Sequence, residues 1–176
     1  PVVTGNYTLA VNTITSGETS PSTFPSSTLR HFSWDEAAIQ IADDSWATSY
    51  GAGTTVTYSY RSSAPTQMPD GTSGFSRFSL AQIEAAEASL AAWASVANIT
   101  FVRVNDGDGY SNNAAIVFGN YSNGAAGAAA FAFTPVTADR SAGSTQGDVW
   151  INSTLSYNAT PVRGEYGYQV LLHEIG

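Results

Sequence analysis

The sequence predicts an α/β fold, with a mixed, twisted β-sheet and helices on its flanks. Three observations lead to this prediction. Hydrophobic residues make up 43% of the 176 residues, which is enough for one sizeable core. Several short β-branched and aromatic runs are separated by turn residues, as in strands. Two capping-box signals each precede a stretch with helical character. The expected order of elements is α-β-α-β-β-β-β-α, without a second domain.

An irregular segment and a capped helix are expected at the start of the chain. Residues 1–30 are rich in Ser, Thr and Pro and show no sustained period, so we expect no regular element there. Ser33 followed by Glu36 matches a capping box, in which the hydroxyl and the carboxylate satisfy free amides at a helix start. We therefore expect a helix over 34–48, which the glycines of 51–53 end.

A strand, a loop and a long helix are expected next. Alternation over 54–60 predicts a strand, and the turn-rich residues 65–74 predict a loop. Ser79 with Gln82 matches a second capping box and opens an Ala-rich helix over 80–97. Within this helix, apolar residues recur at helical spacing, at Ile83, Leu90, Trp93 and Ala97.

Four short strands and a last helix complete the prediction. The strands are expected over 99–104, 115–118, 129–133 and 148–152. The loop over 105–113 is rich in turn residues, and the segment over 119–127 is expected to be flexible. Because Pro135 closes the third of these strands, an edge position is favoured over a central one. The last helix begins near Tyr166 and runs through His173.

Composition argues against several classes of function. The chain has 14 acidic residues against six arginines and no lysine, a net charge of −8, so nucleic acid is not an expected partner. No apolar run is long enough to span a bilayer, so no membrane partner is expected. Without cysteine there is no disulfide, thiolate metal site or thiol nucleophile. A surface dominated by uncharged polar residues fits an extracellular bacterial protein, although residues 1–20 show no signal peptide.

The most informative motif is His173-Glu174-Ile175-Gly176. It matches the first four residues of H-E-x-x-H, a helical motif in which two histidines hold zinc and the glutamate acts as general base. The second histidine would be residue 177. Apolar residues before His173 suit a buried helix that carries a ligand. The alternative is that Gly176 is a helix C-cap and that His173 interacts with the helix dipole.

Other candidate sites are weaker. His31 is the only other histidine, and a role at a helix entry is favoured over a metal role. Asp106 and Asp108 suggest a calcium loop, but Tyr110 and Ser111 do not suit an EF-hand, so a polar turn is expected. No nucleophile elbow or phosphate-binding loop occurs. Core positions are expected for Trp34, Trp46, Trp93 and Trp150.

The chain resembles the N-terminal part of the catalytic domain of a serralysin-type zinc metalloprotease, in the metzincin clan. The resemblance covers about residues 32–176, and we expect 31–176 to form this part of the domain. Its most specific pieces occur in matching order and spacing, at 75–79, 92–94, 99–101, 127–133, 164–167 and 172–176.

The resemblance implies a secreted zinc endopeptidase. His173 matches the first zinc ligand, and Glu174 matches the general base that activates the zinc-bound water. The edge strand on which substrate lies as an added antiparallel strand is matched by Ala129, Ala130, Phe131, Ala132 and Phe133. A plain sheet edge is the alternative interpretation of this strand. The family also has two more zinc histidines, a methionine turn, a tyrosine ligand and a calcium-binding C-terminal repeat domain, none of which is in this sequence.

The expected partners follow from this resemblance. They are a protein or peptide substrate and a companion C-terminal chain, or a continuation of the same polypeptide, that supplies the remaining zinc ligands. A catalytic zinc site needs three protein ligands, and the motif here supplies one. Two other classes remain open: an inactive fragment, and a surface-layer or adhesion domain with a protease fold but no catalysis.

Overall fold

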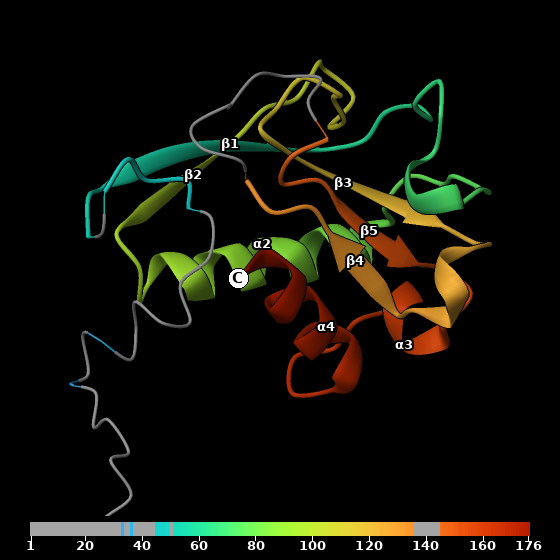
Figure 1. Cartoon of the computed structure of the whole chain (residues 1–176). Coiled ribbons are helices and arrows are strands. Elements are labelled where there is room, and N and C mark those ends of the chain that lie inside the picture. The colour runs from blue at the N-terminus through green and yellow to red at the C-terminus, as the bar shows by residue number, and fades with distance from the viewer. Residues whose placement is uncertain (1–32, 34–35, 37–44, 50, 136–144) are drawn as a thin grey trace, which may run out of the picture. The chain divides into compact units, whose positions relative to one another are not determined.

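The computed structural model describes Ser33, Glu36 and residues 45–49, 51–135 and 145–176 (Figure 1). The predictions for 1–30, for His31 and Trp34, and for most of the first helix fall outside these residues. The chain divides into two units, Pro1–Ile41 and Ala42–Gly176, and the elements described below belong to the second.

The first capping box is confirmed. The Ser33 amide donates to Glu36 Oε2 (2.9 Å), and the Glu36 amide donates to Ser33 Oγ (3.2 Å). The predicted end of this helix is wrong, because residue 45 is not helical and residues 46–49 form a series of bends. There the Trp46 carbonyl accepts a hydrogen bond from Thr54 Oγ1 (3.3 Å), which ties the bend to the first strand.

Five strands form one mixed sheet, in the order β2-β1-β3-β5-β4, which confirms the predicted fold class. Four of them run parallel, and β4 is antiparallel to β5 at one edge. The strands are β1 (Thr54–Tyr60), β2 (Ile99–Arg103), β3 (Ile116–Tyr121), β4 (Ala130–Ala132) and β5 (Val149–Asn152). The bounds of β1 agree with the prediction, whereas β2, β4 and β5 are shorter than predicted. The edge position predicted for β4 is confirmed.

In the described part of the second unit, three α-helices and two short 3₁₀ turns accompany the sheet. They are α2 (Leu80–Ala94), α3 (Ser156–Ala159), α4 (Tyr166–Ile175), η1 (Pro69–Gly71) and η2 (Ala125–Gly127). The second capping box is confirmed, since Ser79 and Gln82 exchange both hydrogen bonds. Helix α2 ends at Ala94 rather than at residue 97, because Ser95 Oγ bonds back to the Ala92 carbonyl (2.6 Å) and the chain turns there. The short helix α3 was not predicted.

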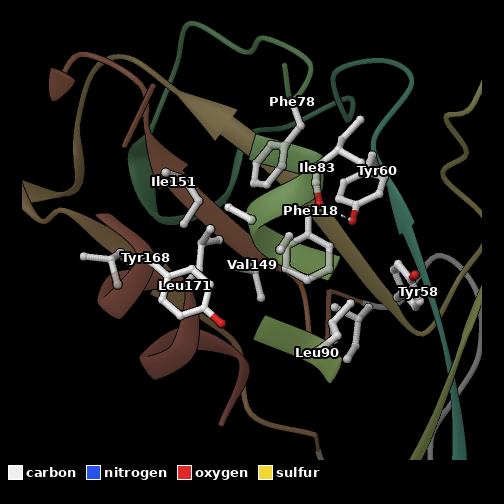
Figure 2. Close-up of a cluster of buried hydrophobic side chains, with 14 of the residues drawn as sticks. Tyr58, Tyr60, Phe78, Ile83, Leu90, Phe118, Val149, Ile151, Tyr168 and Leu171 are labelled. Carbon is white, nitrogen blue, oxygen red and sulfur yellow. Dashed lines mark hydrogen bonds between the residues drawn. The ribbon is translucent and has the colours of Figure 1, made fainter. Parts of the chain in front are cut away.

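The main core lies between the sheet and helices α2 and α4 (Figure 2). Alternate residues of the strands point to this face, as the period of a strand requires. The strand contributions are Val56, Tyr58, Tyr60, Ile116, Phe118, Val149 and Ile151. The helix contributions are Ile83, Ala85, Ala86, Leu90, Tyr168, Val170 and Leu171. The two helices are therefore held on one face of the sheet, and α4 is brought next to the edge strand β4.

The expected flexibility of residues 119–127 is wrong at its start. Gly119, Asn120 and Tyr121 continue β3 and are buried. Gly119 is needed here for space, because a Cβ at this position would lie 3.0 Å from Cζ3 of Trp150. The glycine therefore allows close packing against the Trp150 ring rather than loop motion.

The loop over 105–113 is a polar turn, as predicted. The Gly107 amide donates to Asn105 Oδ1 (2.9 Å), and the Tyr110 amide donates to Asp108 Oδ1 (3.1 Å). Both are local turns stabilised by the side chain of the preceding Asn or Asp.

Of the tryptophans expected in the core, the structure describes Trp46, Trp93 and Trp150, and a fully buried position is confirmed for Trp150. Trp46 and Trp93 are half-buried. Among the described residues, none of the helices has the length and apolar character needed to span a membrane.

Candidate active site

Helix α4 carries the His-Glu pair. Its first turns bury Val170 and Leu171 against the core, so the expected apolar stretch before the motif is present. His173 lies on the exposed side of the helix, while Glu174 is half-buried. This orientation follows from the 3.6-residue period: His173, two residues after the buried Leu171, lies on the opposite side of the helix, whereas Glu174, four residues after the buried Val170, stays near the core side.

Gly176 follows the pair at the C-cap of α4. The Trp93 ring from α2 approaches so closely that a Cβ at Gly176 would lie 1.8 Å from its Cζ2 atom. Trp93 Nε1 also donates to the Leu172 carbonyl (2.9 Å). Only glycine fits at this contact, which positions the last turn of α4 against α2. The close approach of the Trp93 ring therefore accounts for glycine at this position.

A pocket of about 380 Å³ lies between α4 and the start of β4. Its lining residues are Ala129, Ala130, Tyr166, Gln169, Val170, His173 and Glu174. The two segments that the sequence linked to metal binding and to substrate binding are about 40 residues apart, and they meet here. Figure 1 shows α4 beside β4 at this edge of the sheet.

Strand β4 lies at the sheet edge, and some of its main-chain groups have no partner within the part of the chain that the structure describes. The Ala129 carbonyl accepts from the Asn152 amide (2.9 Å), and the Phe133 amide donates to the Asp148 carbonyl (3.1 Å). These residues therefore direct their main-chain groups to β5. Because the direction alternates along an antiparallel strand, the N–H and C=O groups of Ala130 and Ala132 point away from β5.

The side chains of β4 divide between two faces, as the alternation of Ala and Phe indicates. Ala130 and Ala132 pack toward the main core. The Phe131 ring lies on the other face, 5.4 Å from the Tyr121 ring and 5.8 Å from the Phe133 ring between centroids. The small residues thus keep the pocket side of the strand open.

The environment of Glu174 suits proton transfer. Burial raises the pKa of the Glu174 carboxyl above its ordinary value, and the neighbouring His173 acts in the opposite direction. A carboxylate with a raised pKa is a stronger base, and it also holds a proton more readily after accepting one.

Known proteins with similar sequences share one type of activity in their names. The chain matches no protein-family model. It is 38% identical over 150 residues to metallopeptidase AprA of Pseudomonas marginalis, which covers 81% of this chain and 30% of that protein. It is 36% identical over 133 residues to serralysin G of Dickeya chrysanthemi, which covers 72% of this chain and 26% of that protein. It is 40% identical over 124 residues to a serralysin of Photorhabdus sp. strain Az29, which covers 69% of this chain and 24% of that protein.

This chain is a serralysin-type metalloprotease region. It spans less than a third of the length of the relatives that it matches. The relatives bear out the resemblance seen in the sequence, and the observed sheet and helices fit the N-terminal part of such a protease domain.

The described residues do not by themselves form a metal site. Among the described residues, no three His, Cys, Asp or Glu side chains lie together in an arrangement that could hold a metal ion. The pocket offers a single imidazole, that of the exposed His173. A catalytic zinc has three protein ligands, so the described residues fit one of them.

Two lining residues of the pocket were missed in the sequence. Gln169 and Tyr166 come four and seven residues before His173 and share its side of α4. Helical spacing from the motif could have identified them. The side chains that hydrogen-bond to the carbonyls just before β4 have no such sequence signal, because they come from segments distant in the sequence.

Proposed function

We propose that this serralysin-type region belongs to a secreted, zinc-dependent endopeptidase that hydrolyses peptide bonds in proteins. One observation carries the proposal: His173 and Glu174 share a pocket with the start of the free edge strand β4. The names of the relatives, metallopeptidase and serralysin, support the same reaction class.

Each residue has a role in this proposal. Zinc, when bound, supplies Lewis-acid polarisation of a carbonyl and a water of lowered pKa. His173 would be one of its ligands. The Glu174 carboxylate would accept a proton from the attacking water and return it to the leaving amine nitrogen. Burial, which raises the pKa of Glu174, makes the carboxylate a stronger base for the first of these transfers.

Substrate would bind as an added strand. The outward N–H and C=O groups of Ala130 and Ala132 can pair with an extended peptide in an antiparallel arrangement. Such pairing contacts only the main chain of the peptide, so it accepts many sequences. The direction of β4 would place the bound peptide across the pocket that contains Glu174.

The proposal assigns the rest of the site to other sequence. The second and third histidine ligands would come from a continuation of this polypeptide or from a companion chain. Calcium would bind in the C-terminal repeats that the family has, outside this chain. Neither nucleic acid nor a membrane is part of the proposal.

The proposal can be tested with the purified protease that contains this chain. We expect it to hydrolyse casein, to lose this activity with a chelator and to regain it with zinc. His173→Ala should remove bound zinc as measured by atomic absorption. The matched control is His31→Ala, which should retain both zinc and activity. Zinc-loaded wild-type protein without hydrolysis would instead support a non-catalytic protease fold, and a His173→Ala variant that retains zinc would exclude His173 as a ligand.

A further inference from the structure

Three buried side chains donate hydrogen bonds to two consecutive carbonyls just before β4. The Tyr121 hydroxyl donates to the Ala128 carbonyl (2.6 Å), as does Asn152 Nδ2 (3.1 Å). Asn158 Nδ2 donates to the Ala129 carbonyl (2.8 Å). We call Tyr121, Asn152 and Asn158 the carbonyl clamp. Their side chains come from β3, β5 and α3, and these residues are exposed by 0%, 8% and 1%.

The clamp acts immediately beside the pocket. Ala129 is itself a lining residue of the pocket that contains Glu174. The next residue, Ala130, is the first one whose main-chain groups point away from β5. The position of the clamped carbonyls therefore determines where these free groups lie relative to Glu174.

The segment before β4 needs such support. Four consecutive residues adopt the left-handed region, with φ of 97° at Gly124, 53° at Ala125, 49° at Ala126 and 82° at Gly127. This conformation is unfavourable for the two alanines, so the surrounding structure must stabilise it. Strand β4 pairs with β5 over only three residues, which is a short ladder to hold the segment alone.

Asn158 also links the clamp to a second element. Its Nδ2 atom donates to the Asn152 carbonyl (3.0 Å) as well, and its own main-chain carbonyl accepts from Gln82 Nε2 (2.9 Å). Gln82 is the third helical residue of α2 and completes the capping box with Ser79. The Oδ1 atom of Asn158 is buried without a hydrogen-bond partner among the described residues. The site thus uses this amide as a donor to carbonyls.

We propose that the carbonyl clamp positions β4 for substrate binding, through the Ala128 and Ala129 carbonyls, without any of its three side chains touching substrate. This inference rests on the proposed protease function. Its consequence is specific: weakening the clamp should weaken peptide binding and leave the chemical step largely intact, because the main-chain contacts of β4 bind substrate and transition state alike.

The decisive variant is Tyr121→Phe, which removes one hydroxyl and keeps the ring. We expect KM for two fluorogenic peptides of unrelated sequence to rise about 5-fold, with kcat changed by less than about 2-fold. Asn158→Leu should raise KM by about 5- to 30-fold, because it removes two donated bonds. Peptide affinity measured by titration in the inactive Glu174→Gln background should fall by the same factors, with zinc content unchanged.

Matched controls separate positioning from general loss of stability. Tyr60 is also a fully buried tyrosine whose hydroxyl donates to a main-chain carbonyl, that of Ile83 (3.3 Å), and it lies away from β4. Ser59 is a buried serine whose hydroxyl donates to the Ser111 carbonyl (2.9 Å), outside the clamp. Tyr60→Phe and Ser59→Ala should lower thermal stability without raising KM.

The outcomes decide between the alternatives. The clamp is rejected if its variants raise KM no more than these controls do. If Asn158→Leu does not fold, the comparison of Tyr121→Phe with Tyr60→Phe decides alone. A wild-type protein without chelator-sensitive hydrolysis would reject the protease function and the clamp together, whereas failure of the clamp alone leaves wild-type hydrolysis intact.

Discussion

Asp148 shows how a single residue joins several strands. Its carboxylate is 1% exposed, accepts a hydrogen bond from Arg61 Nη2 (2.6 Å) and accepts another from the Val117 amide (3.2 Å). The Arg61 guanidinium also lies over the Trp150 ring, 5.1 Å from its centroid. Burial raises the pKa of Asp148 to about 7, which outweighs the opposite effect of Arg61.

This pKa predicts a pH dependence of stability. Because the pKa in the folded state, about 7, exceeds the ordinary value of 3.8, the folded state binds more protons between these two values. The contribution of Asp148 to the free energy of unfolding should therefore fall as the pH rises from about 4 to about 7. Urea denaturation of wild type and Asp148→Asn across this range measures it. We expect a smaller decline in the variant, and equal slopes would show that Asp148 does not titrate as described.

Glu174 is the residue on which the proposed chemistry depends. Glu174→Gln keeps the size of the side chain and removes the base, so kcat should fall by at least ~10²-fold. Zinc content should stay at the wild-type level, because Glu174 is not a proposed ligand. Steady-state kinetics together with metal analysis provide the measurement. Near-normal turnover of the variant would be incompatible with general-base catalysis by Glu174.

At the scale of elements, β4 combines two opposite requirements. An edge strand must be held firmly by the sheet, yet it must keep main-chain groups free for substrate. The structure separates these tasks along the strand, since Phe131 pairs with Trp150 in β5 while Ala130 directs its amide outward.

This separation predicts different effects on stability for two neighbouring substitutions. Ala130→Pro removes an outward amide, so kcat/KM should fall by about 5- to 30-fold for peptides of unrelated sequence, with thermal stability and zinc content nearly unchanged. Phe131→Pro removes an amide directed at β5 and should lower stability as well. The measurements are peptide hydrolysis and thermal unfolding. Normal cleavage of both peptides by a folded Ala130→Pro protein would mean that β4 is only structural.

At the scale of the whole molecule, the described part of the chain builds a pocket that contains the proposed base, Glu174, and one proposed metal ligand, His173. The core holds α4 against α2 and the sheet, and the clamp holds the start of β4, so both walls of the pocket are supported independently of a metal. One imidazole is nevertheless insufficient for a catalytic zinc.

A polypeptide of these 176 residues alone should therefore bind zinc weakly and hydrolyse no casein. A longer polypeptide that adds the remaining histidines should bind one zinc and be active. Metal titration and caseinolysis of both homogeneous proteins make the comparison. Chelator-sensitive caseinolysis by the 176-residue polypeptide would contradict this expectation and would direct the search for further ligands to His31 first.

Much of the fold could be predicted from local patterns. Both capping boxes are formed by residues three positions apart, and the strand over Thr54–Tyr60 alternates within seven residues, so each signal is complete within its own segment. Gly119 shows where this reasoning fails. Glycine favours a turn by local propensity, but the Trp150 ring, 31 residues away, makes it part of a buried strand.

The sequence by itself determined the fold class, most helices and strands, and the two residues proposed for metal binding and base chemistry. Only the tertiary structure decided that β4 and α4 share a pocket, that Ala130 faces outward, and that Asp148 is buried beside Arg61. The physical reason is the range of the interactions. Caps and periodicity depend on neighbours within one or two turns, whereas the pocket and the clamp depend on side chains that packing brings together from distant segments.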